Sequence, residues 1–157
     1  TVVNVSTKGE EQEAWFVYIV NKRYNTDLRM PICRFKTFVG RMKEIDQAVK
    51  YLIDNEYVRY RRHLGGGYYV SIMSTHNRIV DIRRFFQDRS GNLRPMGDGL
   101  SLKLAEWFEL KNTIISQICA AIPNYDDILE CPDRQDHLGQ IGFLRCTECN
   151  PYDCFSW

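Results

Sequence analysis

The sequence predicts an α+β protein in which an antiparallel sheet is followed by an amphipathic helix, with a helical extension before it and a cysteine-rich tail after it. Between residues 57 and 95, three runs rich in β-branched and aromatic residues and one short segment at 93–95 alternate with turn-forming clusters, which is typical of strands. On both sides of this stretch, apolar residues recur at three- and four-residue steps, which indicates helices. We therefore expect an N-terminal extension at 1–56, a sheet-and-helix domain at 57–122 and an acidic tail at 123–157.

The N-terminal extension is expected to contain one helix. Residues 1–13 are polar and predicted to be frayed, and residues 21–30 are predicted to be a polar connection. The apolar segment at 15–20 is consistent with a buried strand or a short helix, because periodicity does not decide between them. Over 34–55 we predict one continuous core-facing helix, with an apolar face of Phe35, Phe38, Val39, Met42, Ile45, Val49, Leu52 and Ile53.

The four predicted strands are separated by turns of different chemistry. Residues 57–63 and 68–73 are divided by a glycine bend, and residues 78–86 follow a polar turn at 74–77. Residues 93–95 are predicted to be a short edge strand, followed by a flexible glycine-containing step at 97–99. The second helix is predicted from about 102 to 122, with Ser101 as its N-terminal cap and Pro123 as its stop.

Charge is segregated along the chain although the formal net charge is only +1. Residues 59–94 hold eight arginines, two aspartates and no lysine, whereas residues 120–157 carry seven acids and two arginines. A basic block interleaved with aromatic residues favours a polyanionic partner, and the choice of arginine suits phosphate recognition. The alternative interpretation is a solvated surface that happens to use arginine.

One predicted strand shows how a sheet would present the basic block. In residues 78–86, alternation separates two sets of side chains, with Ile79, Asp81 and Arg83 on one face and Val80, Ile82 and Arg84 on the other. Because the helix covers only one face, the other is available to a ligand. Arginines that follow phosphates, and aromatic rings that stack on bases, are the means by which proteins hold single-stranded nucleic acid.

Five short blocks follow one another in order between residues 62 and 122: Tyr69-Val70-Ser71-Ile72, the strand at 78–86, Ser90-Gly91-Asn92-Leu93-Arg94-Pro95, Gly99-Leu100-Ser101-Leu102, and Trp107 with Leu110-Lys111. Together they resemble the C-terminal domain of the transcriptional coactivator family of positive cofactor four. The resemblance implies a curved sheet of four strands followed by a kinked helix. It also implies a nuclear homodimer with paired helices and single-stranded DNA in two antiparallel channels.

By position, the resemblance assigns DNA contacts to the sheet and one of its hairpins. Arg83 stands where the family has a phosphate-binding arginine, Phe86 where it has a stacking tryptophan, and Tyr68 at a basic edge position. Residues 76–78 fall in a hairpin where the family uses basic and aromatic residues. With the arginines of the basic block added, the predicted nucleic-acid contacts are Arg59, Arg61, Arg62, Tyr68, His76, Asn77, Arg78, Arg83, Phe86 and Arg94.

The sequence also departs from the family pattern. The hairpin is shorter and lacks the family's phenylalanine and lysines, and Asp98 places a negative charge where the family has a basic pair. These departures predict weaker binding, or binding shifted toward the arginines at 59–62. Instead of contacting a ligand, Arg83 could form an ion pair with Asp81 or Glu106. Phe86 could pack in the core instead of stacking on a base. For Trp107 we predict core packing.

Four of the six cysteines lie in the last 27 residues. Cys146 and Cys149 have the two-residue spacing that lets two thiolates bind one zinc ion. Cys154 with either Cys131 or His137 would complete a tetrahedral set. One structural zinc held by the tail cysteines and a tail of free thiols are both consistent with this pattern, and disulfides are disfavoured because nothing marks the chain as secreted.

The sequence shows no phosphate-binding loop, no paired-metal carboxylate cluster and no nucleophile with an obvious base, so we predict a non-catalytic protein that needs no other cofactor. The predicted function is single-stranded DNA binding in transcription regulation, replication or repair, without membrane association. Two alternatives stay open. In the first, the chain is a winged helix that binds duplex DNA, because a helix at 34–55 followed by the arginines at 59–62 and a glycine bend is also typical of that fold. In the second, the chain is a protein–protein interaction module that uses the second helix and the tail.

Overall fold

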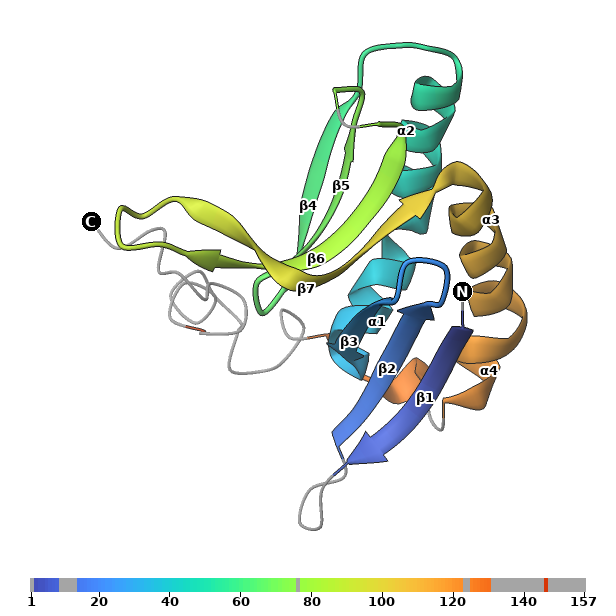
Figure 1. Cartoon of the computed structure of the whole chain (residues 1–157). Coiled ribbons are helices and arrows are strands. Elements are labelled where there is room, and N and C mark those ends of the chain that lie inside the picture. Colours follow the sequence, from blue (N-terminus) through green and yellow to red (C-terminus); the bar gives the residue numbers. More distant parts are fainter. Residues whose placement is uncertain (1, 9–13, 76, 123–124, 131–145, 147–157) are drawn as a thin grey trace.

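The computed structural model describes residues 2–8, 14–75, 77–122, 125–130 and 146. It contains two antiparallel sheets, one with the strand order β1-β2-β3 and one with the order β4-β5-β6-β7, connected by two helices (Figure 1). A further helix follows the second sheet. The predicted α+β class, with a four-stranded antiparallel sheet followed by a helix, is therefore confirmed. None of the described helices combines the length and apolar character needed to cross a membrane.

The first sheet corrects two expectations about the N-terminal extension. It consists of β1 (Val2–Lys8), β2 (Ala14–Asn21) and β3 (Thr26–Pro31). The start that was predicted to be frayed is a strand whose backbone pairs with β2, and the predicted polar connection contains β3. The sequences of β1 and β3 are polar, as loop sequences often are, because these are the outer strands of the sheet. Pairing with the apolar central strand β2 satisfies their backbone hydrogen-bonding groups.

The predicted helix at 34–55 is two helices, α1 (Ile32–Gly40) and α2 (Met42–Ile53). Arg41 separates them, with φ of −90° and ψ of 0°. Gly40 lies at the break, where its high backbone entropy disfavours continuation of a helix. The apolar face continues across the break and is buried as predicted, except that Ile53 is exposed and Val39 is only partly buried.

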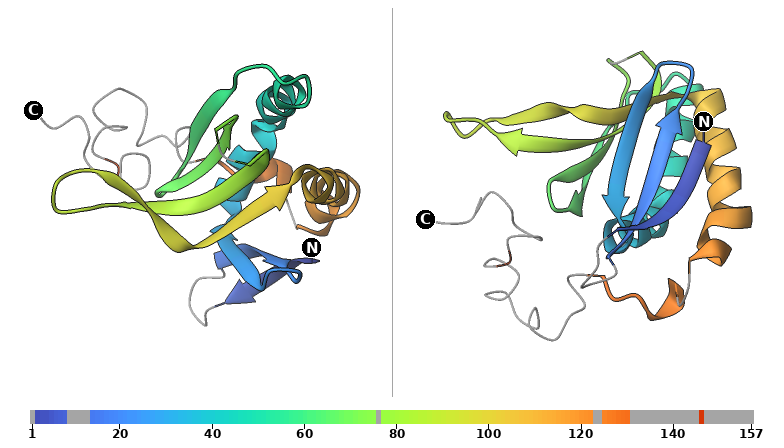
Figure 2. Two further views of the ribbon diagram at one scale, coloured as in Figure 1. Left: turned by 45° about the horizontal axis from the view of Figure 1, so that its top comes forward. Right: turned by 60° about the horizontal axis from the view of Figure 1, so that its bottom comes forward.

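The second sheet consists of β4 (Arg59–Gly65), β5 (Tyr68–Met73), β6 (Ile79–Gln87) and β7 (Leu93–Lys103). The last strand is much longer than the predicted edge strand, and the step at 97–99 that was predicted to be flexible lies within it. Residues 93–95 pair with the end of β6 beyond the reach of β5, so the β6–β7 hairpin projects from the sheet as an arm (Figures 1 and 2).

The helix after the second sheet starts two residues later than predicted. Leu102 and Lys103 are still paired with β6, so α3 (Leu104–Thr113) is preceded by Lys103 rather than capped by Ser101. A π-helical turn (Ile114–Ile118) then leads into α4 (Cys119–Ala121), and a short 3₁₀ helix (Tyr125–Asp127) follows. The π-helical turn is an irregularity of the kind that bends a helix.

One hydrophobic core joins both sheets to the helices, which lie together on one side of the four-stranded sheet (Figure 2). Trp107 of α3 is fully buried and meets Phe38 of α1 edge-on, with ring centroids 5.9 Å apart, so its predicted core role is confirmed. Lys111 Nζ lies 2.6 Å from the Asp46 carboxylate, which connects α3 to α2.

Candidate nucleic-acid interface

The four-stranded sheet has one face covered by helices and one face that is not packed into the core. The covered face carries the buried side chains Val70, Ile72, Val80, Ile82, Leu100 and Leu102. By strand alternation, the opposite face, here called the open face, carries Arg59, Arg61, His63, Tyr69, Ser71, Met73, Ile79, Asp81, Arg83, Phe85 and Ser101. The predicted separation of Asp81 and Arg83 from Val80 and Ile82 is therefore confirmed.

A groove of about 390 Å³ is hollowed into the open face. All four strands contribute to its lining, with Arg61 from β4, Ser71 from β5, Arg83 from β6 and Ser101 from β7 among the polar groups. Phe85, Leu93 and Pro95 form its apolar end toward the arm. A groove with arginines in its walls and apolar surface between them can accept a ligand that is both anionic and aromatic.

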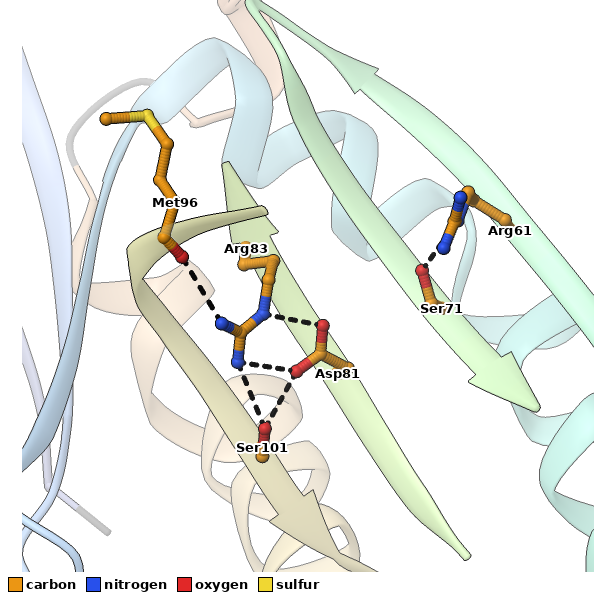
Figure 3. A network of polar contacts seen from close by, with 6 residues as sticks. All are labelled: Arg61, Ser71, Asp81, Arg83, Met96 and Ser101. Carbon is orange, nitrogen blue, oxygen red and sulfur yellow. Dashed lines mark hydrogen bonds and ion pairs between the residues drawn. The ribbon is translucent and has the colours of Figure 1, made fainter. Parts of the chain in front are cut away.

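Arg61 is held in a fixed position above an aromatic ring. Its guanidinium carbon lies 5.1 Å from the centre of the Phe85 ring, and its Nε donates a hydrogen bond of 3.2 Å to Ser71 Oγ (Figure 3). Phe85 itself is buried beneath this arrangement. This hydrogen bond uses only one of the five N–H groups of an arginine, and Arg61 lines the groove.

Three aromatic rings cross the open face from β4 to β6. His63 and Tyr69 lie with ring centroids 4.8 Å apart, and the rings of Tyr69 and Phe85 meet edge-to-face with centroids 5.1 Å apart. The His63 Nε2 atom accepts a hydrogen bond of 3.2 Å from the Gly67 backbone N–H. Burial and the nearby positive charge of Arg34 lower the pKa of His63, which favours the neutral ring that this hydrogen bond requires.

Arg83 sits in a network of polar contacts (Figure 3). It makes a two-pronged ion pair with Asp81, with both N···O distances 2.8 Å. Its remaining contacts are with Ser101 Oγ at 3.1 Å and the Met96 carbonyl at 3.3 Å, and Ser101 also donates to Asp81. Of the two alternative partners, Asp81 is therefore the one that Arg83 contacts.

The approach of β7 to Arg83 depends on a glycine. A Cβ atom placed on Gly99 would lie 2.4 Å from the Arg83 Cβ and 3.1 Å from the Ile82 carbonyl oxygen. Both neighbours belong to the backbone or the root of a side chain, so neither can move aside cheaply. The glycine in the fourth sequence block is thus explained by close packing beside the Arg83 network.

Two of the predicted contact residues lie on the side of the sheet that faces the helices. Arg62 Nε is 3.4 Å from the Glu44 carboxylate of α2, and Tyr60 donates a hydrogen bond of 3.0 Å to the same group. The hydrogen bond from Tyr60 lowers the pKa of Glu44, and burial with this bond raises the pKa of Tyr60 to about 12. Tyr68 donates to the Arg29 carbonyl of β3 and lies beneath Arg84, so it joins the two sheets.

The remaining predicted contacts lie at the two ends of β6. Asn77 and Arg78 occupy the turn before it, both with positive φ, and are exposed, whereas His76 lies outside the described residues. Phe86 and Arg94 pair across the arm. Phe86 is exposed and does not pack in the core, which was the alternative to a contact with DNA. Arg94 Nε contacts Asp88 at 3.0 Å, and the hydrogen bonds that Asp88 accepts lower its pKa.

The predicted set missed the aromatic members of the open face. Phe85, Tyr69 and His63 lie beside Arg61 and Arg83 but were not among the predicted contacts. Strand alternation is the signal that could have identified them. Phe85 is two residues from Arg83 and His63 is two residues from Arg61, and side chains at this spacing in a strand point to the same face. Position-by-position comparison with the family pattern favoured Phe86 instead, whose side chain alternates away from Phe85.

The predicted zinc set falls almost wholly outside the described residues. Cys131, Cys149 and Cys154 lie there, as does His137, and Cys146 alone is described. Within the described ranges, no three His, Cys, Asp or Glu side chains gather in a way that would hold a metal ion.

Comparison with known proteins agrees with the resemblance seen in the sequence. Residues 76–113 match the family model described as Transcriptional Coactivator p15 (PC4). The match covers β6, β7 and α3, the elements that carry Arg83, Phe85 and Trp107. The family that this model describes is one of transcriptional coactivators, and the match is confined to these elements. No match was found among the curated proteins or the solved structures.

Proposed function

We propose that the chain binds single-stranded DNA without catalysis, in transcription regulation, replication or repair, and that the strand lies in the groove of the open face. The observation that carries this proposal is Arg61, an arginine preset above an aromatic ring on a sheet face that lies outside the core. The family match over β6, β7 and α3 supports the same ligand class. The process and a nuclear location follow the family resemblance.

A single strand suits this groove better than a duplex for two reasons. The guanidinium plane of Arg61 offers a flat surface in the groove, and only unpaired bases present their own flat faces to such a surface. Phosphates need donors, and Arg61 keeps most of its N–H groups for them. A duplex would bring phosphates to the groove but keep its bases stacked inside.

Arg83 has a more restricted part in the proposed complex. Asp81 neutralises its charge, and its contacts with Asp81, Ser101 and Met96 use four of the five N–H groups of its guanidinium. We infer that Arg83 offers one N–H to the strand and mainly holds β6 and β7 in the shape of the groove. Arg61 is then the stronger test of binding, because its loss removes a donor without leaving a carboxylate unpaired.

The proposal is tested with two neighbouring arginines on opposite faces of β4. Anisotropy of a labelled oligonucleotide is measured single-stranded and as a duplex, at two salt concentrations, for wild type, Arg61→Gln and Arg62→Gln. Arg61→Gln should weaken single-strand binding about tenfold and reduce the salt-dependence slope by about 0.7, the loss of one phosphate contact. Arg62→Gln should have little effect, because Arg62 contacts Glu44 on the helix side.

Each outcome decides between the candidate functions. Preference for the single strand with loss only in Arg61→Gln supports the open face. Preference for duplex would favour the winged-helix alternative, although β4 and β5 belong to one sheet with β6 and β7. No binding to either form would favour a protein-interaction module. Sedimentation velocity of the same samples shows whether the binding species is the homodimer that the resemblance implies.

A further inference from the structure

The turn between β2 and β3 lies outside the residues that match the family, yet it is rich in groups that bind nucleic acid. Lys22, Arg23 and Tyr24 follow one another in this turn and are all exposed, Tyr24 by 46%. The guanidinium carbon of Arg23 lies 5.6 Å from the centre of the Tyr24 ring, and Lys103 Nζ of β7 lies 5.7 Å from it. One exposed aromatic ring is thus surrounded by cations from two sheets.

The turn is fixed in place by the buried residue at its base. Asn21 is 1% exposed and donates a hydrogen bond to the Glu106 carboxylate of α3, and its side-chain oxygen accepts from the Arg23 backbone N–H at 3.2 Å. These contacts hold the turn against the junction of β7 and α3. Tyr24 is therefore positioned by tertiary structure, and ordering it for a ligand would cost little entropy.

A second groove connects this turn to the open face. It has a volume of about 500 Å³, and its lining includes Tyr24, Thr26, Arg78 and Lys103. Ile79 and Ser101 line it as well, and the same two residues line the groove of the open face. The two grooves therefore meet at Ile79 and Ser101, at the end of the sheet opposite the arm.

We propose that the β2–β3 turn is a second contact site for a single strand, with Tyr24 as a stacking platform and Lys22, Arg23, Arg78 and Lys103 facing phosphates. The strand that occupies the open face continues past Ile79 and Ser101 onto this turn. Stacking of a base on an aromatic ring is stronger than an exposed cation–π contact, so a base displaces Arg23 or Lys103 from the ring and leaves that cation for a phosphate. The inference rests on the proposed function and extends it to the first sheet.

The test is a length series of labelled oligothymidine from about 4 to about 20 nucleotides, a range that brackets known single-strand site sizes. Wild type is compared with Tyr24→Ala, with Tyr24→Phe, which keeps the ring, and with Tyr51→Ala. Tyr51 of α2 is a matched control, because it is 44% exposed and lines neither groove. Tyr24→Ala should lose about tenfold in affinity for long strands and nothing for the shortest strands that bind. Tyr24→Phe and Tyr51→Ala should behave as wild type.

Three other results would overturn the inference. Unchanged affinity of Tyr24→Ala for long strands would show that the turn makes no contact. An equal loss at every length would place Tyr24 within the primary site and not in an extension of it. If wild type binds no strand of any length, the proposed function fails and the second contact site fails with it, whereas the first two results leave the function of the open face intact.

Discussion

The two faces of the four-stranded sheet are made from alternate residues of the same strands, but they are stabilised by different interactions. On the covered face, side chains such as Val80 and Ile82 are fully buried against the helices. On the open face, Asp81 and Arg83 of the same strand meet in directional polar contacts. Burial is non-directional and serves stability, whereas directional contacts fix the positions of groups that a ligand can use. Folding therefore depends mainly on the covered face, and the open face is the one on which we propose that recognition takes place.

The largest test of this comparison uses two isoleucines of β6. Ile82→Ala on the covered face should lower the free energy of unfolding by about 2–5 kcal/mol, because it leaves a cavity in a close-packed core. Ile79→Ala on the half-buried open face should cost less than about 1 kcal/mol. Chemical denaturation of both variants measures the difference. Equal losses would mean that the open face contributes to folding as much as the covered face does.

A smaller effect is expected where β7 passes Arg83. Gly99→Ala should cost about 1–3 kcal/mol in the free energy of unfolding, because the added methyl group meets the Arg83 Cβ at 2.4 Å. Gly97→Ala, two residues earlier in the same strand, is the control, since a Cβ there meets nothing within 4 Å. Thermal or chemical unfolding of the two variants checks this. A neutral Gly99→Ala would show that β7 can move away from β6 without loss.

The smallest expected effect concerns pH. The pKa of His63 is lower in the folded chain than its ordinary value of 6.5, so the unfolded chain binds the proton more readily. The stability that neutral His63 contributes is therefore present above pH 6.5 and is lost as pH falls through that value toward the lower folded pKa. We expect His63→Gln to flatten this part of the stability profile.

The measurement is denaturant unfolding of wild type and His63→Gln between about pH 5.5 and pH 8, a window centred on the ordinary histidine pKa. Asp88 and Glu44, whose pKa values are lowered below those of ordinary carboxyl groups, titrate below this window. Parallel profiles for the two proteins would show that the pKa of His63 is the same in the folded and the unfolded chain.

Local patterns in the sequence were sufficient for the apolar faces of the helices and for the two faces of the second sheet. Periodicity predicted the apolar face of α1 and α2, and alternation separated Val80 and Ile82 from Asp81 and Arg83. Patterns of this kind depend only on the geometry of one element. Other predictions were wrong. The helix at 34–55 is broken at Arg41, β7 is longer than the predicted edge strand, and β1 and β3 were predicted to be unstructured. Each of these features depends on the segments that pack against it or pair with it.

The residue types of the candidate site could be predicted from the sequence, but most of the contacts between them could not. The basic block and its aromatic residues were visible in the sequence, and Arg61 and Arg83 were among the predicted contacts. Their partners were not, since Phe85 and Ser71 reach Arg61 only through the register of three strands. The same holds for Tyr24, which comes near Lys103 because the first sheet packs beside β7.

The alternation of residues along the strands, the apolar faces of the helices and the concentration of positive charge between residues 59 and 94 all follow from the order of the amino acids. These properties need only neighbours along the chain. Packing and strand pairing place Arg62 against Glu44 and Arg61 in the groove, pair Arg83 with Asp81, and bring the turn at Tyr24 next to the open face. Each of these depends on contacts between residues far apart in the chain, which strand register and packing bring together.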